Sequence, residues 1–117
     1  MSHARSPSKE EKGVLSALLR LKAETLPFID GLDNLLVQEM SDGGMSGLLL
    51  IPKGTETVDR TFGKQIVAGE FTDTDGVPVS ATINTDGDNR LYELDVWKVN
   101  FAPLCHWPDP AAIRITE

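Results

Sequence analysis

The chain has 117 residues, 40% of them hydrophobic, and a formal net charge of −7 at pH 7. This length is sufficient for one hydrophobic core, whereas the longest apolar run, at residues 48–51, is far shorter than a membrane span of about 20 residues. The negative charge repels phosphate backbones, so composition argues against nucleic-acid binding as well as against a membrane segment.

Residues 1–7 show no hydrophobic periodicity and predict a disordered N-terminus, followed by a single α+β domain over residues 8–117. Ser8 and Glu11 have the spacing of a capping box, which begins a helix. Apolar residues then recur at near-helical spacing, at Val14, Leu15, Leu18, Leu19 and Leu21. This apolar stripe predicts an N-terminal helix that is stabilised by docking on a sheet.

The segment after this helix is harder to interpret. Pro27 is expected to break or kink the helix, and residues 32–40 fit the apolar spacing of either a helix or a strand. Residues 41–44 have turn chemistry with two glycines, and residues 47–51 form a short apolar run. We favour a hairpin that pairs residues 35–40 with 47–51, and the helical alternative for 32–40 stays open.

Three alternating runs separated by two Asp/Gly turns predict a β-meander in the C-terminal half. The runs are residues 64–72, 77–84 and 90–100, and residues 111–116 are a candidate for a short edge strand. Within the middle run the apolar residues that should face the core are Val77, Val79, Ala81 and Ile83. The predicted fold is therefore α+β: an N-terminal helix packed on a mostly antiparallel sheet of about five strands, with a C-terminal β-meander.

The last run, residues 90–100, is expected to be the most central strand and to carry the functional residues. Glu93, Asp95 and Trp97 project to one face because alternate residues of a strand share a face. Glu70 on an earlier strand joins that face if the register allows it. Carboxylates so close together repel one another unless a basic group or a cation lies between them.

Three interpretations of Glu93 and Asp95 are open. The pair could be salt-bridged within the sheet by a nearby cation, for which the candidates are Arg60, Lys64, Arg90 and Lys98. Together with Trp97 and Glu70, it could instead form a surface that binds a partner. Acid–base catalysis is the weakest interpretation, because no nucleophile, oxyanion donor or phosphate loop accompanies the carboxylates. We therefore assign no catalytic residue.

No metal site and no cofactor is predicted. The two Asp/Gly turns resemble calcium loops, but the first ligand positions would fall on Phe71 and Thr82. A zinc site needs four ligands, and the chain offers only Cys105, His106 and His3 as cysteine or histidine ligands. Cys105 is instead expected to be buried as a small hydrophobic residue. A single cysteine permits no internal disulfide, which favours the cytoplasm.

Three segments carry a resemblance to a known group of proteins: VQEMSDGGMSGLLL, GEFTDTDGVPVSATINTDG and YELDVWKVNFAPL. With their DGGM-type turn and their ELD-W-K strand before Pro-Leu, they resemble a family of small uncharacterised bacterial proteins with no assigned function. The resemblance covers residues 35–104. It implies no activity, cofactor or catalytic residue.

These observations together predict a small acidic cytoplasmic protein that acts as a protein-binding or regulatory module. Its partner would be a basic protein, and an inhibitor or immunity protein acting against a secreted toxin is one concrete form. One alternative is a small enzyme or metal-dependent site that uses Glu93 and Asp95. Another is a structural homo-oligomer that exposes Trp97 or Trp107, so the chain is expected to be a monomer or a homodimer.

Overall fold

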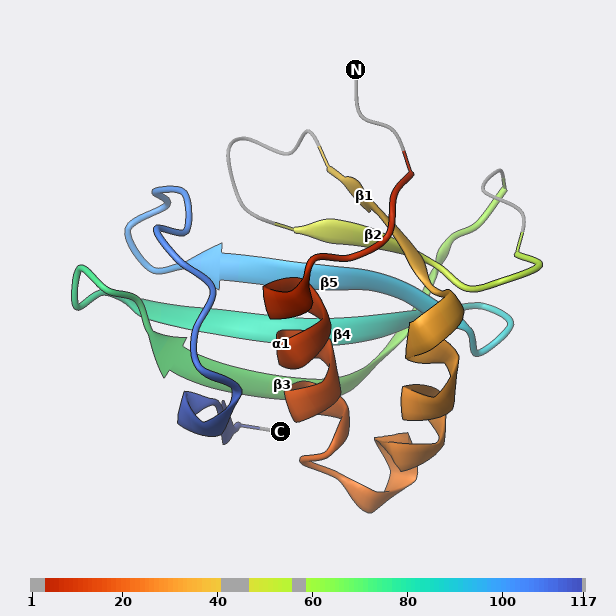
Figure 1. Cartoon of the computed structure of the whole chain (residues 1–117), viewed down its shortest axis with the longest axis horizontal. Coiled ribbons are helices and arrows are strands. Elements are labelled where there is room, and N and C mark those ends of the chain that lie inside the picture. The colour runs from red at the N-terminus through yellow and green to blue at the C-terminus, as the bar shows by residue number, and fades with distance from the viewer. Residues whose placement is uncertain (1–3, 41–46, 56–58, 117) are drawn as a thin grey trace.

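An open antiparallel sheet with helices on one face forms the body of the protein (Figure 1). This computed structural model describes residues 4–40, 47–55 and 59–116. Its six strands are arranged in the order β1-β2-β5-β4-β3-β6. Their bounds are β1 Leu36–Glu39, β2 Leu48–Ile51, β3 Phe62–Thr72, β4 Pro78–Asp86, β5 Leu91–Lys98 and β6 Arg114–Ile115. The α+β prediction is confirmed, with one strand more than the expected five.

The N-terminal helix α1 (Lys9–Leu19) begins at the predicted capping box. The backbone N–H of Glu11 donates to the Ser8 hydroxyl at 3.1 Å, and a Glu11 carboxylate oxygen accepts from the Ser8 N–H at 2.8 Å. The apolar stripe of α1 is fully buried against the sheet, as predicted, at Val14, Leu15, Leu18 and Leu19. Burial of this stripe is what holds the helix on the sheet, because an isolated helix of this length is marginal.

Arg5, in the segment predicted to be disordered, forms an antiparallel bridge with Val37 of β1. Its guanidinium donates to both carboxylate oxygens of Glu11, at 2.8 and 2.9 Å, and also pairs with Glu39. The chain before α1 therefore lies along the outer edge of β1, where a strand would otherwise present unpaired backbone groups.

A second helix, η1 (Ala23–Asn34), follows α1 and was not expected. It is a 3-10 helix that contains Pro27, so the proline lies inside a helix rather than between elements. A 3-10 helix repeats every three residues, and Ile29, Leu32 and Leu35 recur at this spacing and pack on the core. A search for the 3.6-residue period of an α-helix misses such a pattern. Residues 32–40 thus contain both predicted alternatives, the end of η1 and then β1.

The predicted hairpin and meander are both confirmed. β1 pairs with β2 in the register Leu36↔Ile51, and the turn that joins them, residues 41–46, lies outside the described residues. β3, β4 and β5 are consecutive antiparallel neighbours. Along β4, Val79 and Ala81 are buried and Ser80 between them is exposed, as the alternation predicted.

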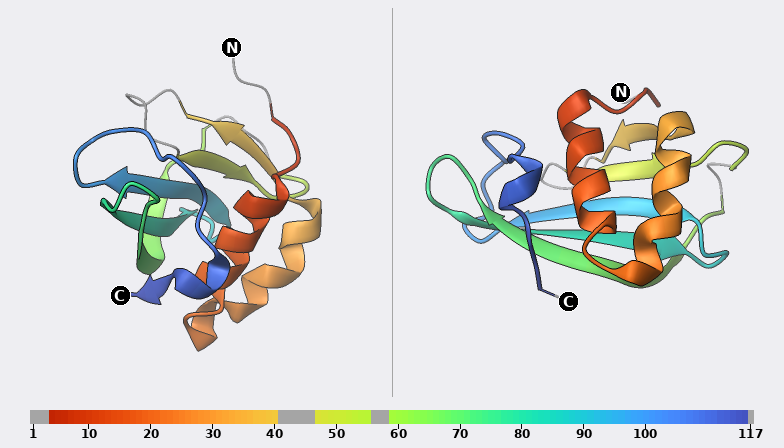
Figure 2. Two further views of the ribbon diagram at one scale, coloured as in Figure 1. Left: turned by 60° about the vertical axis from the view of Figure 1, so that its left-hand side comes forward. Right: turned by 60° about the horizontal axis from the view of Figure 1, so that its bottom comes forward.

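The described helices and the C-terminal segment lie on one face of the sheet, which Figures 1 and 2 show from three directions. On this face Gly69 of β3 allows a close approach, since a Cβ there would come within 2.9 Å of Leu18 and Ile113 side-chain atoms. We call the opposite side of the sheet the outer face. Within the described ranges, no helix is long and apolar enough to cross a membrane.

Candidate functional site

The four residues predicted to form a binding site lie on the outer face. Across the strands, Trp97 is opposite Ser80 and Ser80 is opposite Glu70, so these side chains share one face. Asp95 and Glu93 precede Trp97 at two-residue intervals on the same strand and therefore also point outward. The structure thus brings the predicted residues to one surface that the helices do not cover.

The surroundings of these four residues differ. Glu93 accepts a hydrogen bond from the Asn84 side-chain amide at 2.8 Å, and Glu70 accepts one from Arg114 at 3.2 Å. Asp95 is exposed, and 43% of Trp97 is accessible to solvent. Arg114 partly neutralises Glu70, whereas the hydrogen-bond donor to Glu93 is a neutral amide.

Three of the four cations predicted as bridges for Glu93 and Asp95 form ion pairs with other carboxylates. Arg60 and Arg90 both pair with Asp86, and Lys98 pairs with Asp73 and Asp75. Lys64 lies opposite the buried Thr85, on the side of the sheet that carries the helices. Glu93 itself accepts its hydrogen bond from the neutral Asn84 amide rather than from one of these cations.

Trp97 has an aromatic neighbour that the alternation of strand residues does not predict. The rings of Trp97 and Phe101 are 5.7 Å apart between centroids and meet at 78°, an edge-to-face contact. Phe101 is 68% exposed and has a φ of +61°. Because Phe101 follows the end of β5 in a proline-containing segment, the alternation that placed Trp97 does not extend to it.

On the helix face, the end of β5 carries a buried ion-pair cluster. Lys98 is only 1% exposed, and its ammonium donates to Asp73 at 2.8 Å and to Asp75 at 2.6 Å. Asp73 also accepts the backbone N–H groups of Cys105, at 2.8 Å, and of His106, at 3.3 Å. The cluster therefore fastens the C-terminal segment to the β3–β4 turn.

The hydrogen bonds of this cluster set the protonation of its members. Burial by itself raises the pKa of Asp73, but the N–H groups of Cys105 and Thr74 and the Lys98 ammonium outweigh it, so the net pKa is well below normal. The hydrogen bonds to Asp73 and then Asp75 raise the pKa of Lys98. Both groups are charged at neutral pH.

Cys105 is exposed, which corrects the expectation that it is a buried hydrophobic residue. Its thiol lies 3.6 Å from Lys98 Nζ and 3.7 Å from an Asp75 oxygen, at the margin of a polar cluster rather than in the core. Ligand atoms of Asp73, Asp75 and Cys105 come within 4.8 Å of one another, a separation that would suit a metal ion. The Lys98 ammonium, however, already bonds to both carboxylates and neutralises much of their charge.

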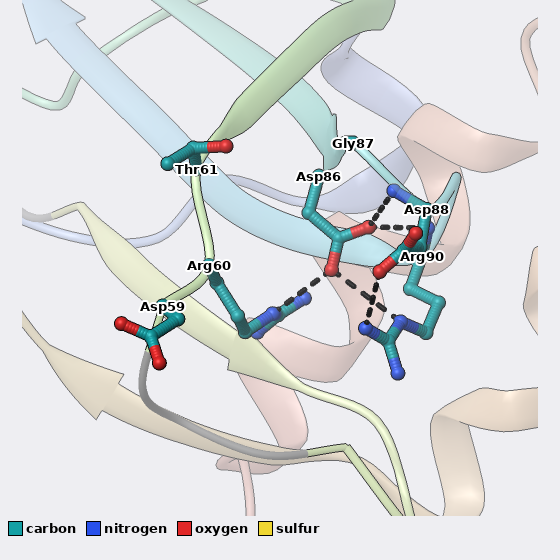
Figure 3. Close-up of a pocket in the computed structure, with 7 residues that line it drawn as sticks. All are labelled: Asp59, Arg60, Thr61, Asp86, Gly87, Asp88 and Arg90. Carbon is teal, nitrogen blue, oxygen red and sulfur yellow. Dashed lines mark hydrogen bonds and ion pairs between the residues drawn. The ribbon is translucent and has the colours of Figure 1, made fainter.

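A hollow of about 350 Å³ opens at the other end of β5, beside the β4–β5 turn (Figure 3). Arg60 and Asp86 lie at its base, both almost fully buried and joined by a 2.9 Å ion pair. Arg60 also donates to the Leu50 and Leu91 carbonyls and lies over the Tyr92 ring, 5.0 Å from its centroid. Arg60 thereby ties the β2–β3 connection to β2 and β5.

Asp86, the buried carboxylate of this hollow, is poorly suited to proton transfer. Burial raises the pKa of Asp86, but the Arg90 N–H, the Arg60 guanidinium and the Asp88 N–H outweigh this effect and lower the net pKa. A general acid or base needs a pKa near the working pH, so Asp86 is better suited to holding the turn than to catalysis.

Residues 4–108 match a family that is described as a domain of unknown function (DUF6984). The chain belongs to this family. The resemblance to an uncharacterised family is thereby confirmed, whereas the bacterial source stays a prediction. No curated protein and no solved structure matches the chain.

The stretch that matches DUF6984 contains β1–β5, and so it includes the outer face, the Lys98 cluster and the Arg60–Asp86 pair. In the Lys98 cluster and in the Arg60–Asp86 pair, opposite charges form ion pairs that hold parts of the fold together. The outer face differs in exposure, because Asp95, Trp97 and Phe101 are exposed, whereas the Lys98–Asp73 and Arg60–Asp86 ion pairs are buried. Among the sites considered, it is the one with chemistry suited to another molecule.

Proposed function

We propose that this DUF6984 domain is a protein-binding module that recognises a basic partner through its outer face. The recognition face comprises Glu70, Glu93, Asp95 and Trp97. The observation that carries the proposal is the strand register, which puts these side chains on one side of the sheet. The described helices lie on the other side (Figure 2).

The two kinds of side chain on the recognition face have different expected roles. Acidic groups raise the rate of encounter with a positively charged partner, and the net charge of −7 adds to this attraction. Exposed Trp97 supplies apolar area of the kind that anchors interfaces and slows dissociation. We expect the partner to bind the half of the recognition face that lies near Trp97. At the opposite end of β5, Arg60 donates to the Leu91 carbonyl and holds the β2–β3 connection there.

We place this function in the cytoplasm, since the lone Cys105 forms no internal disulfide and suits a reducing compartment. An inhibitor or immunity role is one form that a small acidic binder with a basic partner can take. Self-association is a second candidate, favoured by the exposure of Trp97 and Phe101 together on one surface.

The experiment compares two double variants that change net charge equally. In Glu93→Gln/Asp95→Asn both changes lie on the recognition face, whereas in Glu10→Gln/Glu24→Gln they lie on exposed positions of α1 and η1. The probe is a fluorescent octa-arginine peptide, titrated at low and at high salt. At low salt the first variant should bind octa-arginine about fivefold more weakly than the unmodified protein, which is the effect expected from losing two surface ion pairs. At high salt the two affinities should be equal, because salt screens these pairs.

The control double variant should change the affinity for octa-arginine by less than about twofold. Equal losses in both variants would show that binding follows net charge rather than the recognition face, and the proposal would be wrong. Sedimentation of the free protein tests the second candidate, because a dimer that dissociates on Trp97→Ala substitution would indicate self-association instead.

A further inference from the structure

The Trp97–Phe101 pair forms an exposed aromatic corner at the end of β5. The two rings meet at 78° with centroids 5.7 Å apart, so their faces are nearly perpendicular. Large parts of both rings remain accessible, 43% for Trp97 and 68% for Phe101. An edge-to-face pair inside a core would be enclosed by other apolar groups, whereas this pair presents ring surface to solvent.

The backbone holds Phe101 in an unfavourable conformation to make this contact. Its φ of +61° lies in the left-handed region, which is an outlier for a bulky side chain. The Phe101 N–H donates to the Lys98 carbonyl at 2.9 Å, and the Asn100 side chain accepts from the Ala102 N–H at 3.1 Å, so a tight turn fixes this geometry. Burial of the ring does not compensate for the strain, and strain of this kind is concentrated at functional sites.

Negative charge lies beside the corner. Asp95 is two residues before Trp97 on the same face of β5, about 7 Å along the strand. Glu70 is two strands away, across Ser80. Aromatic faces flanked by carboxylates favour a cation, because the ring quadrupole and the nearby negative charge both attract it.

We propose that Trp97 and Phe101 bind an arginine side chain of the basic partner, with Asp95 supplying the neighbouring negative charge. This inference rests on the proposed function and adds to it the chemical group that is recognised. Arginine fits better than lysine because its planar guanidinium stacks on a ring face while its N–H groups remain available to a carboxylate. The protein uses the same contact internally, where Arg60 lies 5.0 Å from the Tyr92 centroid.

The test uses the full chain with a single arginine as the probe. The peptide acetyl-Gly-Gly-Arg-Gly-Gly-amide is titrated while the indole N–H signal of Trp97 is followed by NMR, and Trp97→Phe identifies that signal against Trp107. The matched peptide carries citrulline, which has the shape of arginine without its charge. Titrations are run at high salt, where general attraction to an acidic protein is screened.

The arginine peptide should shift the Trp97 signal in a saturable way and bind at least about fivefold more tightly than the citrulline peptide. Phe101→Leu should weaken binding of the arginine peptide by a similar factor. Phe62→Leu is the control, because Phe62 is also exposed but lies at the start of β3. Thermal melting of both variants verifies that they fold.

Equal binding of the two peptides, or an unchanged Trp97 signal, would overturn the arginine site. If that happens while octa-arginine still distinguishes the two double variants, the arginine site is wrong and the recognition face stands. If the Trp97 signal shifts with protein concentration alone and the protein sediments as a dimer, a second copy occupies the corner and the proposal is also wrong.

Discussion

The ammonium of Lys98 lies 2.8 Å from a carboxylate oxygen of Asp73, and both side chains are almost completely buried. Lys98 occupies a strand position that faces the helices, in line with Leu94 and Val96. A charged group is tolerated there because Asp73 and Asp75 neutralise it and the Pro103 carbonyl lies 3.4 Å away. The pair connects the end of β5 to the β3–β4 turn.

Asp73→Asn should destabilise the protein, because it leaves the Lys98 ammonium buried with less compensating charge. The expected result is a melting temperature lower by at least about 5 °C. The control is Asp88→Asn, which removes a 79% exposed carboxylate paired with Arg90 and should change the melting temperature little. Similar effects of the two variants would contradict a stabilising role for the buried pair.

Stability should depend on pH in a defined way. The pKa values of Asp73, Asp86 and Glu11 are lowered on folding, so their contribution is present above the unfolded values of about 4 and is lost as pH falls through the folded values. The raised pKa of Lys98 has the opposite sign, and its contribution is lost only above about pH 10. Urea unfolding should therefore show a plateau near neutral pH and a steep loss below about pH 4. Asp88→Asn is the control, and its free energy of unfolding should show the same plateau near neutral pH.

Chelation should leave the protein unchanged. The Lys98 ammonium bonds to both carboxylates of the Asp73–Asp75–Cys105 group, so a metal ion would have to displace it. Melting temperatures with EDTA and after adding zinc should agree with that of the dialysed protein, since a ligand specific for the native state would raise it. A drop of several degrees with EDTA, restored by zinc, would show that a metal is bound.

Gly63→Ala should destabilise the sheet. A Cβ at this position would lie 2.2 Å from the Asp86 carbonyl oxygen, so the β3 and β4 backbones would have to separate. The expected loss is about 1–3 kcal/mol in the free energy of unfolding. Gly31→Ala in η1 is the matched control, since no described atom lies within 4 Å of its added Cβ, and its effect should be within about 0.5 kcal/mol. Urea denaturation of both variants makes the comparison.

Phe101→Gly should increase stability or leave it unchanged, although it removes an aromatic ring. Glycine adopts a φ of +61° without strain, and the Phe101 ring is largely exposed. Phe62→Gly removes another exposed ring from a strand and should cost about 0.5–1 kcal/mol. A comparable loss in both variants, measured by thermal unfolding, would show that the Phe101 ring contributes to the fold rather than to recognition.

Local features made most of the fold predictable from the sequence. The capping box at Ser8, the Asp/Gly turns and the two-residue alternation in β4 each depend on neighbours in the chain, and each is present in the structure. The alternation also placed Glu93, Asp95 and Trp97 on one face of β5. The helix η1 escaped prediction because a three-residue period differs from the α-helical one.

Contacts between distant residues were decided only by the tertiary structure. The pairing of β2 with β5 places the hairpin beside the meander and determines which face the helices cover. The same packing buries Lys98 against Asp73, holds Cys105 at the surface and places Phe101 against Trp97. The physical reason is that local backbone geometry decides which side chains share a strand face, and the sequence alone determined this. Which faces and turns meet depends on burial and charge pairing over the whole chain.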